Sequence, residues 1–200
     1  MGDTMKDDLR IQKGLETKDR IRAAAISILA REGMSGLSAK KIADEAGISK
    51  STIFHHFHSV DDILVDLFEV ITSEATQSLS SFNCESLEEF FRALGKLTIE
   101  LAEKNRETFI ALFHYFNYAL IHPDYKHRIH NLKQQLIKVY SNCMQAIEPT
   151  KPAVLINIAE SIVITLDAFG MHYSLDGDKE KFLNQWKIQS DMYCRYLRSE

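Results

Sequence analysis

Apolar residues recur every three or four positions along most of this 200-residue chain. This spacing predicts amphipathic α-helices rather than strands. His122-Pro123 separates two of the later helices, because the residue before a proline avoids helical backbone. The sequence therefore predicts an all-α protein of about nine helices. The clearest helical runs are residues 17–32, 61–81, 86–105, 124–147 and 152–174, followed by a last helix after the turn Asp176-Gly177-Asp178.

Residues 38–57 hold two short helical patterns joined by a tight turn. Gly47 ends the first pattern, since glycine enters the left-handed region at little steric cost. Ser49 is placed to cap the second helix, because its hydroxyl can accept a bond from a free backbone N–H. Ile48 and Ile53 would pack the second helix onto the first. This arrangement is a helix-turn-helix, which places the start of its second helix in the DNA major groove.

The flanks of the motif continue the pattern. An amphipathic helix precedes it, Gly36-Leu37-Ser38 leads into it, His56-Phe57 closes it, and Asp61-Asp62 opens a long helix. In this order and spacing, residues 17–71 resemble the N-terminal domain of the TetR family of transcriptional repressors. The resemblance implies a homodimer that binds a pseudo-palindromic DNA operator and releases it when a small-molecule inducer binds.

The same resemblance divides the chain into three parts. Residues 1–16 are expected to form a flexible N-terminal arm, residues 17–60 the helix-turn-helix domain, and residues 61–200 a helical ligand-binding and dimerisation domain. Residues 1–60 carry ten Lys/Arg and eight Asp/Glu, whereas residues 61–200 carry fourteen and twenty. This asymmetry has the sign expected of a DNA-binding module on an acidic body. The arm either reaches a minor groove through Lys6, Arg10 and Lys13 or is a solvated tail.

The resemblance assigns the contacts to DNA. Ser38 should bond a phosphate, and Lys40 and Lys41 should contact the backbone beside it. Lysine can donate to guanine, and the threonine methyl can touch a thymine methyl. For Lys41 and Ser51, plain solvation is an equally good interpretation. The expected set on and around the second helix is Ser49, Lys50, Ser51, Thr52, Phe54, His55 and His56.

This chain departs from the family pattern at three positions near that helix. Phe54 and His55 stand where the family often has tyrosines, and Val60 stands where it often has a lysine. These changes remove groups that usually hold phosphate. His55, His56 and His58 crowd the same surface, and imidazolium would add positive charge. We therefore expect DNA to be bound more weakly at pH 8 than at pH 6.

An inducer pocket and a dimer interface are also implied by the resemblance. Glu160 in an aromatic pocket would favour a cationic ligand. The polar groups of the apolar segment 152–174, such as Asn157, either pair across the dimer or meet a ligand. The expected pocket residues are Leu97, Leu101, Phe109, Phe113, Phe116, Asn117, Leu136, Tyr140 and Glu160. The expected interface residues are Ile158, Ile162, Thr165, Asp167, Phe169, Trp186 and Tyr193.

Composition adds few constraints. Apolar content of 45% and charged content of 26% are ordinary for a globular protein. The three cysteines are far apart with no CxxC, which fits reduced thiols in the cytoplasm. We expect no membrane-spanning segment, no secretory signal and no cofactor.

Other chemistries have weak support in the sequence. His127 and His130 have a spacing that could hold a metal, but exposed helical histidines are more often solvated and no further ligand completes a set. No catalytic or phosphate-loop motif is present, so an enzyme is not expected. Two other functions remain open. One is an architectural DNA-binding protein without an inducer, and the other is a ligand-binding protein that has lost DNA binding.

Overall fold

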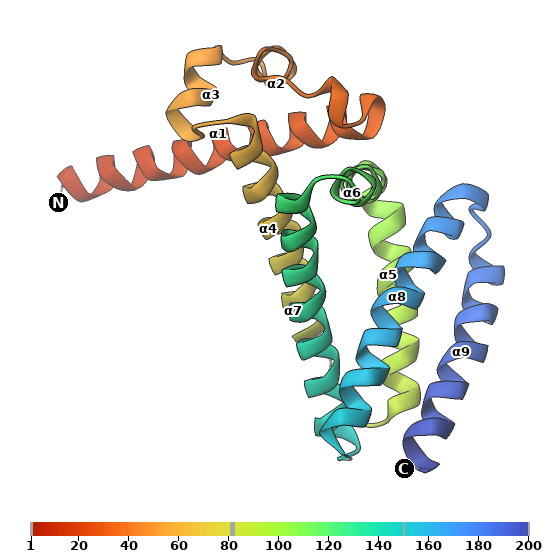
Figure 1. The fold of residues 1–200 in the computed structure, drawn as a ribbon. Helices are drawn as coiled ribbons and strands as arrows, with labels where there is room; N and C mark the ends of the chain where they lie inside the picture. Colours follow the sequence, from red (N-terminus) through yellow and green to blue (C-terminus); the bar gives the residue numbers. More distant parts are fainter. Residues whose placement is uncertain (1, 81–82, 150, 200) are drawn as a thin grey trace. The chain divides into compact units, whose positions relative to one another are not determined.

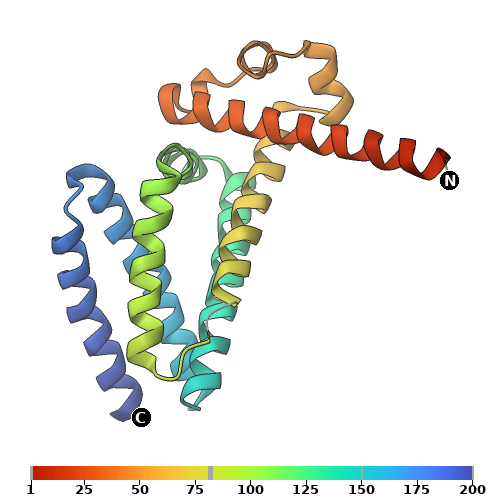
Figure 2. The same ribbon diagram turned by 180° about the vertical axis from the view of Figure 1, so that it is seen from behind.

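The computed structural model describes residues 2–80, 83–149 and 151–199, and these residues form nine α-helices and one short 3-10 helix with no strand (Figures 1 and 2). The expectation of an all-α protein of about nine helices is confirmed. Residues 81 and 82, at the expected end of the helical run 61–81, lie outside the described residues. The chain divides into two compact units. One comprises Met1–Ile71 and Ile110–Tyr115, and the other comprises Thr72–Phe109 and Phe116–Glu200.

The N-terminal unit is built on α1 (Gly2–Glu32), η1 (Met34–Gly36), α2 (Ala39–Ala46), α3 (Lys50–His56) and the first half of α4 (Val60–Ser80). One side of α1 packs against α2 and η1, and α2 in turn packs against α3. The fully buried side chains of this unit include Ile21, Ala25, Ile28, Leu29, Ile42 and Ile53.

The first helix begins at Gly2 rather than at residue 17, where the sequence predicts its start, so residues 2–16 of the expected flexible arm are helical. Bonds one turn apart stabilise the part of this segment nearest to Thr17. Gln12 donates to Glu16 at 3.3 Å, and the Thr17 hydroxyl donates to the Lys13 carbonyl at 2.8 Å. The side chain of Lys6 lies outside the described residues.

The boundary between the two units also differs from the expected one after residue 60. Ile63, Leu64 and Leu67 of α4 are buried within the N-terminal unit. The ring of Phe68 lies 3.7 Å, between centroids, from the ring of Tyr115. The N-terminal unit therefore includes half of α4 and a short stretch of α6 (Arg106–Ala119), which the sequence assigned to the other domain.

The C-terminal unit contains α5 (Leu87–Lys104), α7 (Pro123–Ile147), α8 (Pro152–Asp176) and α9 (Lys179–Ser199), together with parts of α4 and α6. These helices begin and end where the sequence predicts. The Ser86 hydroxyl accepts from the Glu89 N–H at 3.2 Å, Pro123 opens α7, and Gly177 ends α8 with a φ of 67°.

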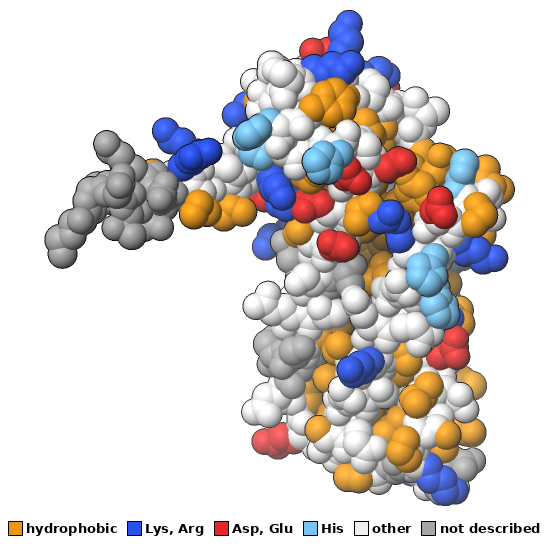
Figure 3. Space-filling view, turned by 60° about the vertical axis from the view of Figure 1, so that its left-hand side comes forward, with side chains coloured by type: hydrophobic (Ala, Val, Ile, Leu, Met, Phe, Trp, Pro, Cys, Tyr) orange, Lys and Arg blue, Asp and Glu red, His pale blue; other side chains and the backbone are white. Residues whose placement is uncertain are grey.

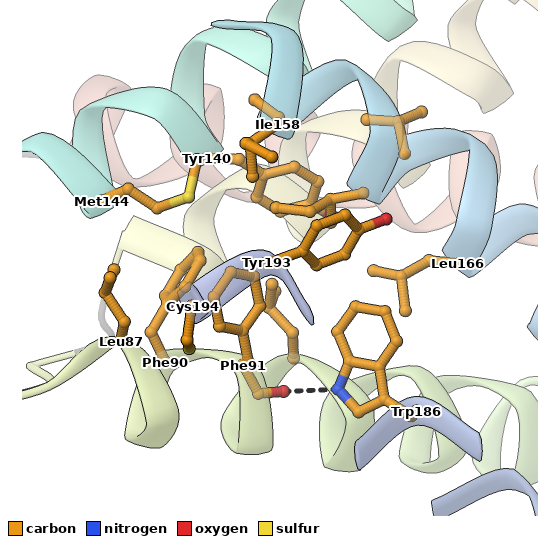
Figure 4. Packing of buried hydrophobic residues seen from close by; sticks show 14 of the residues in the cluster. Leu87, Phe90, Phe91, Tyr140, Met144, Ile158, Leu166, Trp186, Tyr193 and Cys194 are labelled. Atoms are coloured by element: carbon orange, nitrogen blue, oxygen red, sulfur yellow. Dashed lines mark hydrogen bonds between the residues drawn. The ribbon is translucent and has the colours of Figure 1, made fainter. Parts of the chain in front are cut away.

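The core of this unit is rich in aromatic side chains from several helices (Figure 4). Phe90 and Phe91 of α5 face Tyr140 of α7 and Tyr193 of α9. Trp186 is only 2% exposed, and its indole Nε1 donates to the Phe91 carbonyl at 2.6 Å. The indole thus satisfies its polar atom inside the core.

Among the described residues, α8 is the one helix long and apolar enough, by length and composition, to cross a membrane. One such helix is weak evidence for a membrane span, so the expectation of no membrane-spanning segment stays a prediction. Burial gives another reason for this composition. Leu155, Ala159, Ile162 and Leu166 are buried in the core of the C-terminal unit. A core helix passes the same test of length and hydropathy.

Candidate nucleic-acid interface and ligand-binding region

The turn between α2 and α3 has the geometry that the sequence predicts. Ser38 caps α2, with its hydroxyl accepting from the Lys41 N–H at 3.2 Å. Gly47 ends α2 in the left-handed region at φ 63° and ψ 39°. Ser49 caps α3 by accepting from the Thr52 N–H at 3.0 Å. Each cap satisfies backbone groups that a helix end leaves open, so the helix ends on both sides of the turn are stabilised.

Two arginines of α1, which no sequence motif indicates, stabilise this part of the fold. Arg20 donates to the carbonyls of Ala46 and Gly47, where α2 ends and its free carbonyls carry negative partial charge. Arg22 donates to the Asp66 carboxylate on α4 at 2.6 Å. These bonds join residues that are far apart in sequence, so no local pattern indicates them.

The face of α3 expected to read DNA is largely open to solvent. Lys50, Ser51, Phe54 and His55 are exposed, whereas Thr52 and His56 are half-buried. Figure 3 shows basic and histidine side chains on the surface of the N-terminal unit, with apolar side chains between them. Exposed donors of this kind on a helix-turn-helix can contact phosphates and base edges.

Contacts along α3 organise several of these groups before any DNA is bound. The Lys50 ammonium lies 5.7 Å from the centre of the Phe54 ring, one turn further along. This cation–π contact gives Phe54 a part in placing the lysine. The Ser49 hydroxyl lies 2.7 Å from that of Ser51 and 2.8 Å from that of Thr52. These three hydroxyls form one hydrogen-bonded cluster at the start of α3.

Lys41 differs from the other expected backbone contacts. Its ammonium is paired with Glu32, and this bond is the main cause that lowers the pKa of the Glu32 carboxyl. Lys40 is exposed at the same end of α2. A phosphate approaching Lys41 therefore competes with a carboxylate of the protein, whereas the Ser38 hydroxyl and Lys40 face solvent.

The histidines near α3 are not equivalent. The rings of His55 and His56 lie 5.2 Å apart. Partial burial lowers the pKa of His56, and the neighbouring charges of His55 and Lys18 lower it further. Protonation of His56 is therefore shifted to more acidic pH than for an ordinary histidine.

The residues expected to line a pocket are distributed over both units. Leu97, Leu101, Phe109, Phe116 and Leu136 are half-buried in the C-terminal unit, where Asn117 is exposed and Tyr140 is buried. Phe113 belongs to the stretch Ile110–Tyr115 of the N-terminal unit. The Phe109 ring lies against Gly170 of α8, where an added Cβ would be 2.5 Å from Cζ.

Glu160 is paired inside the subunit. Its carboxylate accepts from the Lys133 ammonium at 2.9 Å. The cationic-ligand hypothesis based on Glu160 is therefore not supported, because a lysine already balances its charge. Asp167 has a different environment. Its side chain is accessible, yet desolvation raises the pKa of its carboxyl to about 6 despite the opposing charge of Lys133.

Most of the residues expected at a dimer interface lie in the core of the subunit instead. Burial removes them from any surface that a partner could contact, so these assignments are corrected. Thr165 is half-buried and bonds the Tyr193 hydroxyl at 2.9 Å. Of the expected set, only Asp167 is exposed. The buried members are Ile158, Ile162, Trp186 and Tyr193, and Phe169 packs against the same core.

Other apolar residues of α8 and α9 are exposed. On α8, Ile164 is 57% and Leu175 is 78% exposed. On α9, Ile188, Met192 and Tyr196 follow one another at four-residue spacing and share one exposed side. We call these five residues the outer apolar set. The spacing on α9 was visible in the sequence and could have separated this side from the buried one.

Within the described residues, no three His, Cys, Asp or Glu side chains come together in a group that could hold a metal ion. His127 and His130 are both exposed on α7.

Comparisons with known proteins agree with this geometry. Residues 21–67 match the family model described as bacterial regulatory proteins, tetR family. The HTH-type transcriptional repressor NicS of Pseudomonas putida is 25% identical over 160 residues, which cover 79% of this chain and 68% of NicS. The HTH-type transcriptional regulator PksA of Bacillus subtilis is 26% identical over 91 residues, covering 46% of this chain and only 44% of PksA.

Solved structures share the fold over nearly the whole chain. A transcriptional regulator from Rhodococcus sp. Rha1 superposes with a TM-score of 0.76 at 18% identity, covering 89% of this chain and 96% of that one. The regulator FadR from Bacillus subtilis, solved in complex with stearoyl-CoA, gives a TM-score of 0.71 at 16% identity, covering 88% and 96%.

Proposed function

The chain belongs to the TetR family of helix-turn-helix transcriptional regulators, and on that premise we propose that it is a homodimeric repressor released from its operator by a small-molecule inducer. The capped α2–turn–α3 geometry is the observation that carries the proposal. It presents the exposed side of α3 in the orientation that a major groove accepts. Its relatives are regulators rather than enzymes, and we infer that it acts in the cytoplasm.

Lys50 and His55 are the side chains we propose to meet base edges or adjacent phosphates. Both are exposed on α3, and the contact with Phe54 keeps the Lys50 ammonium near the helix surface. The Ser38 hydroxyl keeps its hydrogen for a phosphate, because it only accepts in the cap of α2. Lys40 would add charge to the same phosphate contact.

The outer apolar set supports the dimer. Ile188, Met192 and Tyr196 on α9 and Ile164 and Leu175 on α8 expose side chains that a second copy would cover. A two-fold axis would bring α8 and α9 of both copies into a four-helix arrangement. Two α3 helices about 34–36 Å apart would then read successive major grooves.

The inducer is proposed to bind in the C-terminal unit. The half-buried apolar side chains there, such as Leu101 and Phe116, offer surface that an apolar part of a ligand could cover. FadR, solved with stearoyl-CoA, shows that a protein of this fold can hold a ligand. Release of DNA requires the ligand to favour the released state by several kcal/mol, roughly 5 for a nearly complete switch.

The test of DNA binding is capture and sequencing of genomic fragments by the purified protein at about 150 mM salt, where non-specific phosphate binding is weak. We expect one or a few palindromic sites for the native chain and for Lys138→Ala, which removes an exposed lysine of α7. Lys50→Ala should lose about tenfold or more in affinity. Many scattered sites would indicate an architectural protein, and no enriched site would contradict operator binding.

The test of the dimer is the molar mass in solution. Ile188→Glu places a charge on the outer apolar set, and Gln134→Glu adds the same charge to an exposed position of α7. Ile188 is 64% exposed, and in a symmetric dimer each change counts twice, so losing the burial of Ile188 costs roughly 2–4 kcal/mol, or about 10–10³ in dimer affinity. Only Ile188→Glu should yield monomers. Equal masses for both variants would place the interface elsewhere.

A further inference from the structure

Two of the three cysteines lie at the same end of the C-terminal unit. Cys84 precedes α5, and Cys143 lies near the end of α7. Figure 2 shows the start of α5 and the end of α7 at the same end of this unit. Both thiols are half-buried and pack against the hydrophobic core, and both line one recess of about 320 Å³. The other residues lining it are Asn83, Phe90, Asn142, Ala146 and Ile147.

Cys194 provides the contrast within the same chain. It lies on α9, is only 4% exposed and belongs to the core of the C-terminal unit, where a cysteine acts as a small hydrophobic residue. Cys84 and Cys143 instead reach a recess that is open to small molecules and that holds far more than one water. Two thiols on one small cavity can react with each other once one of them is oxidised.

We propose that Cys84 and Cys143 form a reversible dithiol–disulfide pair that is oxidised by hydroperoxides. The thiolate of one cysteine attacks the O–O bond of the peroxide, giving a sulfenic acid and releasing water or an alcohol. The second thiol then attacks the sulfenic sulfur, forming the S–S bond and releasing water. In total, two thiols lose two hydrogens and one hydroperoxide is reduced by two electrons.

The surroundings of the two sulfurs set the speed of the first step. Burial, followed by the charge of Glu89, raises the pKa of Cys84, while Arg92 acts in the opposite direction. Burial raises the pKa of Cys143, and the neighbouring Cys84 raises it further. Because the thiolate is the reactive form, this pair responds to sustained rather than brief oxidant exposure.

The bond would fasten the start of α5 to the end of α7. These segments are far apart in sequence, and both border the core shown in Figure 4, where Phe90 and Met144 are labelled. A cross-link at this end restricts any rearrangement of α7 against α5. The inference goes beyond the proposed function, because it concerns thiol chemistry that needs neither an operator nor an inducer.

The experiment uses the reduced full-length chain treated with hydrogen peroxide. We expect free thiols, counted after denaturation, to fall from three to one. Peptide mapping without reductant should give one species joining the peptides of Cys84 and Cys143, lighter by two hydrogens. Dithiothreitol should restore all three thiols.

Single variants control for fold and for site. Cys194→Ser should still form the cross-link, whereas Cys84→Ser and Cys143→Ser should form no intramolecular disulfide. Far-UV circular dichroism establishes that each variant is folded. A cross-link that includes Cys194, disulfides only between chains, or sulfinic acids without any cross-link would each overturn the proposal.

Discussion

Replacing Gly95 with alanine tests how tightly the core of the C-terminal unit is packed. Gly95 lies on α5 beneath the indole of Trp186. A Cβ at this position would stand 2.3 Å from Cδ1 and 2.7 Å from Nε1 of the indole. Real Cβ atoms do not approach heavy atoms so closely, so the ring or the helix must move. Trp186 is 2% exposed, which leaves little room for that movement.

Three free-energy contributions decide the outcome. Overpacking a close-packed core costs about 1–3 kcal/mol. Moving the indole also weakens its 2.6 Å bond to the Phe91 carbonyl, and an unsatisfied buried donor costs about 1–3 kcal/mol. Alanine returns about 1 kcal/mol through its better helix propensity. Gly95→Ala should therefore destabilise the unit by about 1–5 kcal/mol, a fall in Tm of roughly 2–20 °C for a chain of this size.

The assay is urea unfolding at a fixed protein concentration, because dimerisation would make the midpoint depend on concentration. Trp186 is the only tryptophan, so its fluorescence reports the C-terminal unit directly. Gly14→Ala is the matched control on α1, since its added Cβ would meet nothing within 4 Å beyond its chain neighbours and the backbone of its own helix turn. It should leave the tryptophan transition unchanged. A Gly95→Ala protein as stable as the native chain would refute the packing argument.

Three further predictions follow from single residues. Gly47→Ala should destabilise the N-terminal unit by about 1–2 kcal/mol and lower operator affinity, because a φ of 63° is unfavourable for any residue with a Cβ. Urea unfolding followed by circular dichroism would measure the stability, and DNA titration would measure the affinity. The pKa of His56 is lowered in the folded protein, so near pH 6 the unfolded chain binds more protons than the folded one, and the free energy of unfolding rises with pH. His56→Gln should flatten this rise, which denaturation midpoints of the N-terminal unit between pH 5 and 7.5 would measure. Asp167 has a pKa raised to about 6, so the folded chain holds its proton longer and stability falls as pH rises from about 4 through 6. Asp167→Asn should remove that fall, and tryptophan-detected midpoints at pH 5 and 7.5 that change equally in both proteins would contradict it.

The helix boundaries could be predicted from the sequence because they depend on neighbouring residues. A serine cap, a proline in the first turn and a glycine with positive φ each act within a few positions of the helix end. Ser49, Ser86, Pro123 and Gly177 all act in this way. The start of α1 was missed because the charged segment before Thr17 gives no apolar period, although its side chains bond one turn apart.

The sequence predicts which residues of the candidate DNA surface are exposed, but not which contacts their side chains make. The exposure of Lys50 and His55 follows from the helical period once Ile53 is assigned to the core. The pairing of Lys41 with Glu32 joins two helices, and no period of either helix indicates it. The sequence likewise gives no sign that Glu160 of α8 pairs with Lys133 of α7, so the carboxylate looked free to bind a cationic ligand.

The sequence did not indicate which side of α8 faces the core, and the reason is different. Ile162 and Ile164 are identical in type and two positions apart, yet one is 0% and the other 57% exposed. A helix that is apolar nearly all round has no polar side to show which apolar residues face the core. On α9 the polar positions are more numerous, and they separate Trp186 and Tyr193 from Ile188 and Met192. Only the structure shows which side of α8 faces its neighbouring helices. Ser161 and Thr165 hydrogen-bond the Tyr193 hydroxyl of α9, and the Glu160 carboxylate accepts from Lys133 of α7. Since those groups bond within the subunit, they mark the side of α8 that faces α7 and α9, whereas the exposed side carries Ile164 and Leu175 together with the polar side chains of Asn157 and Asp167.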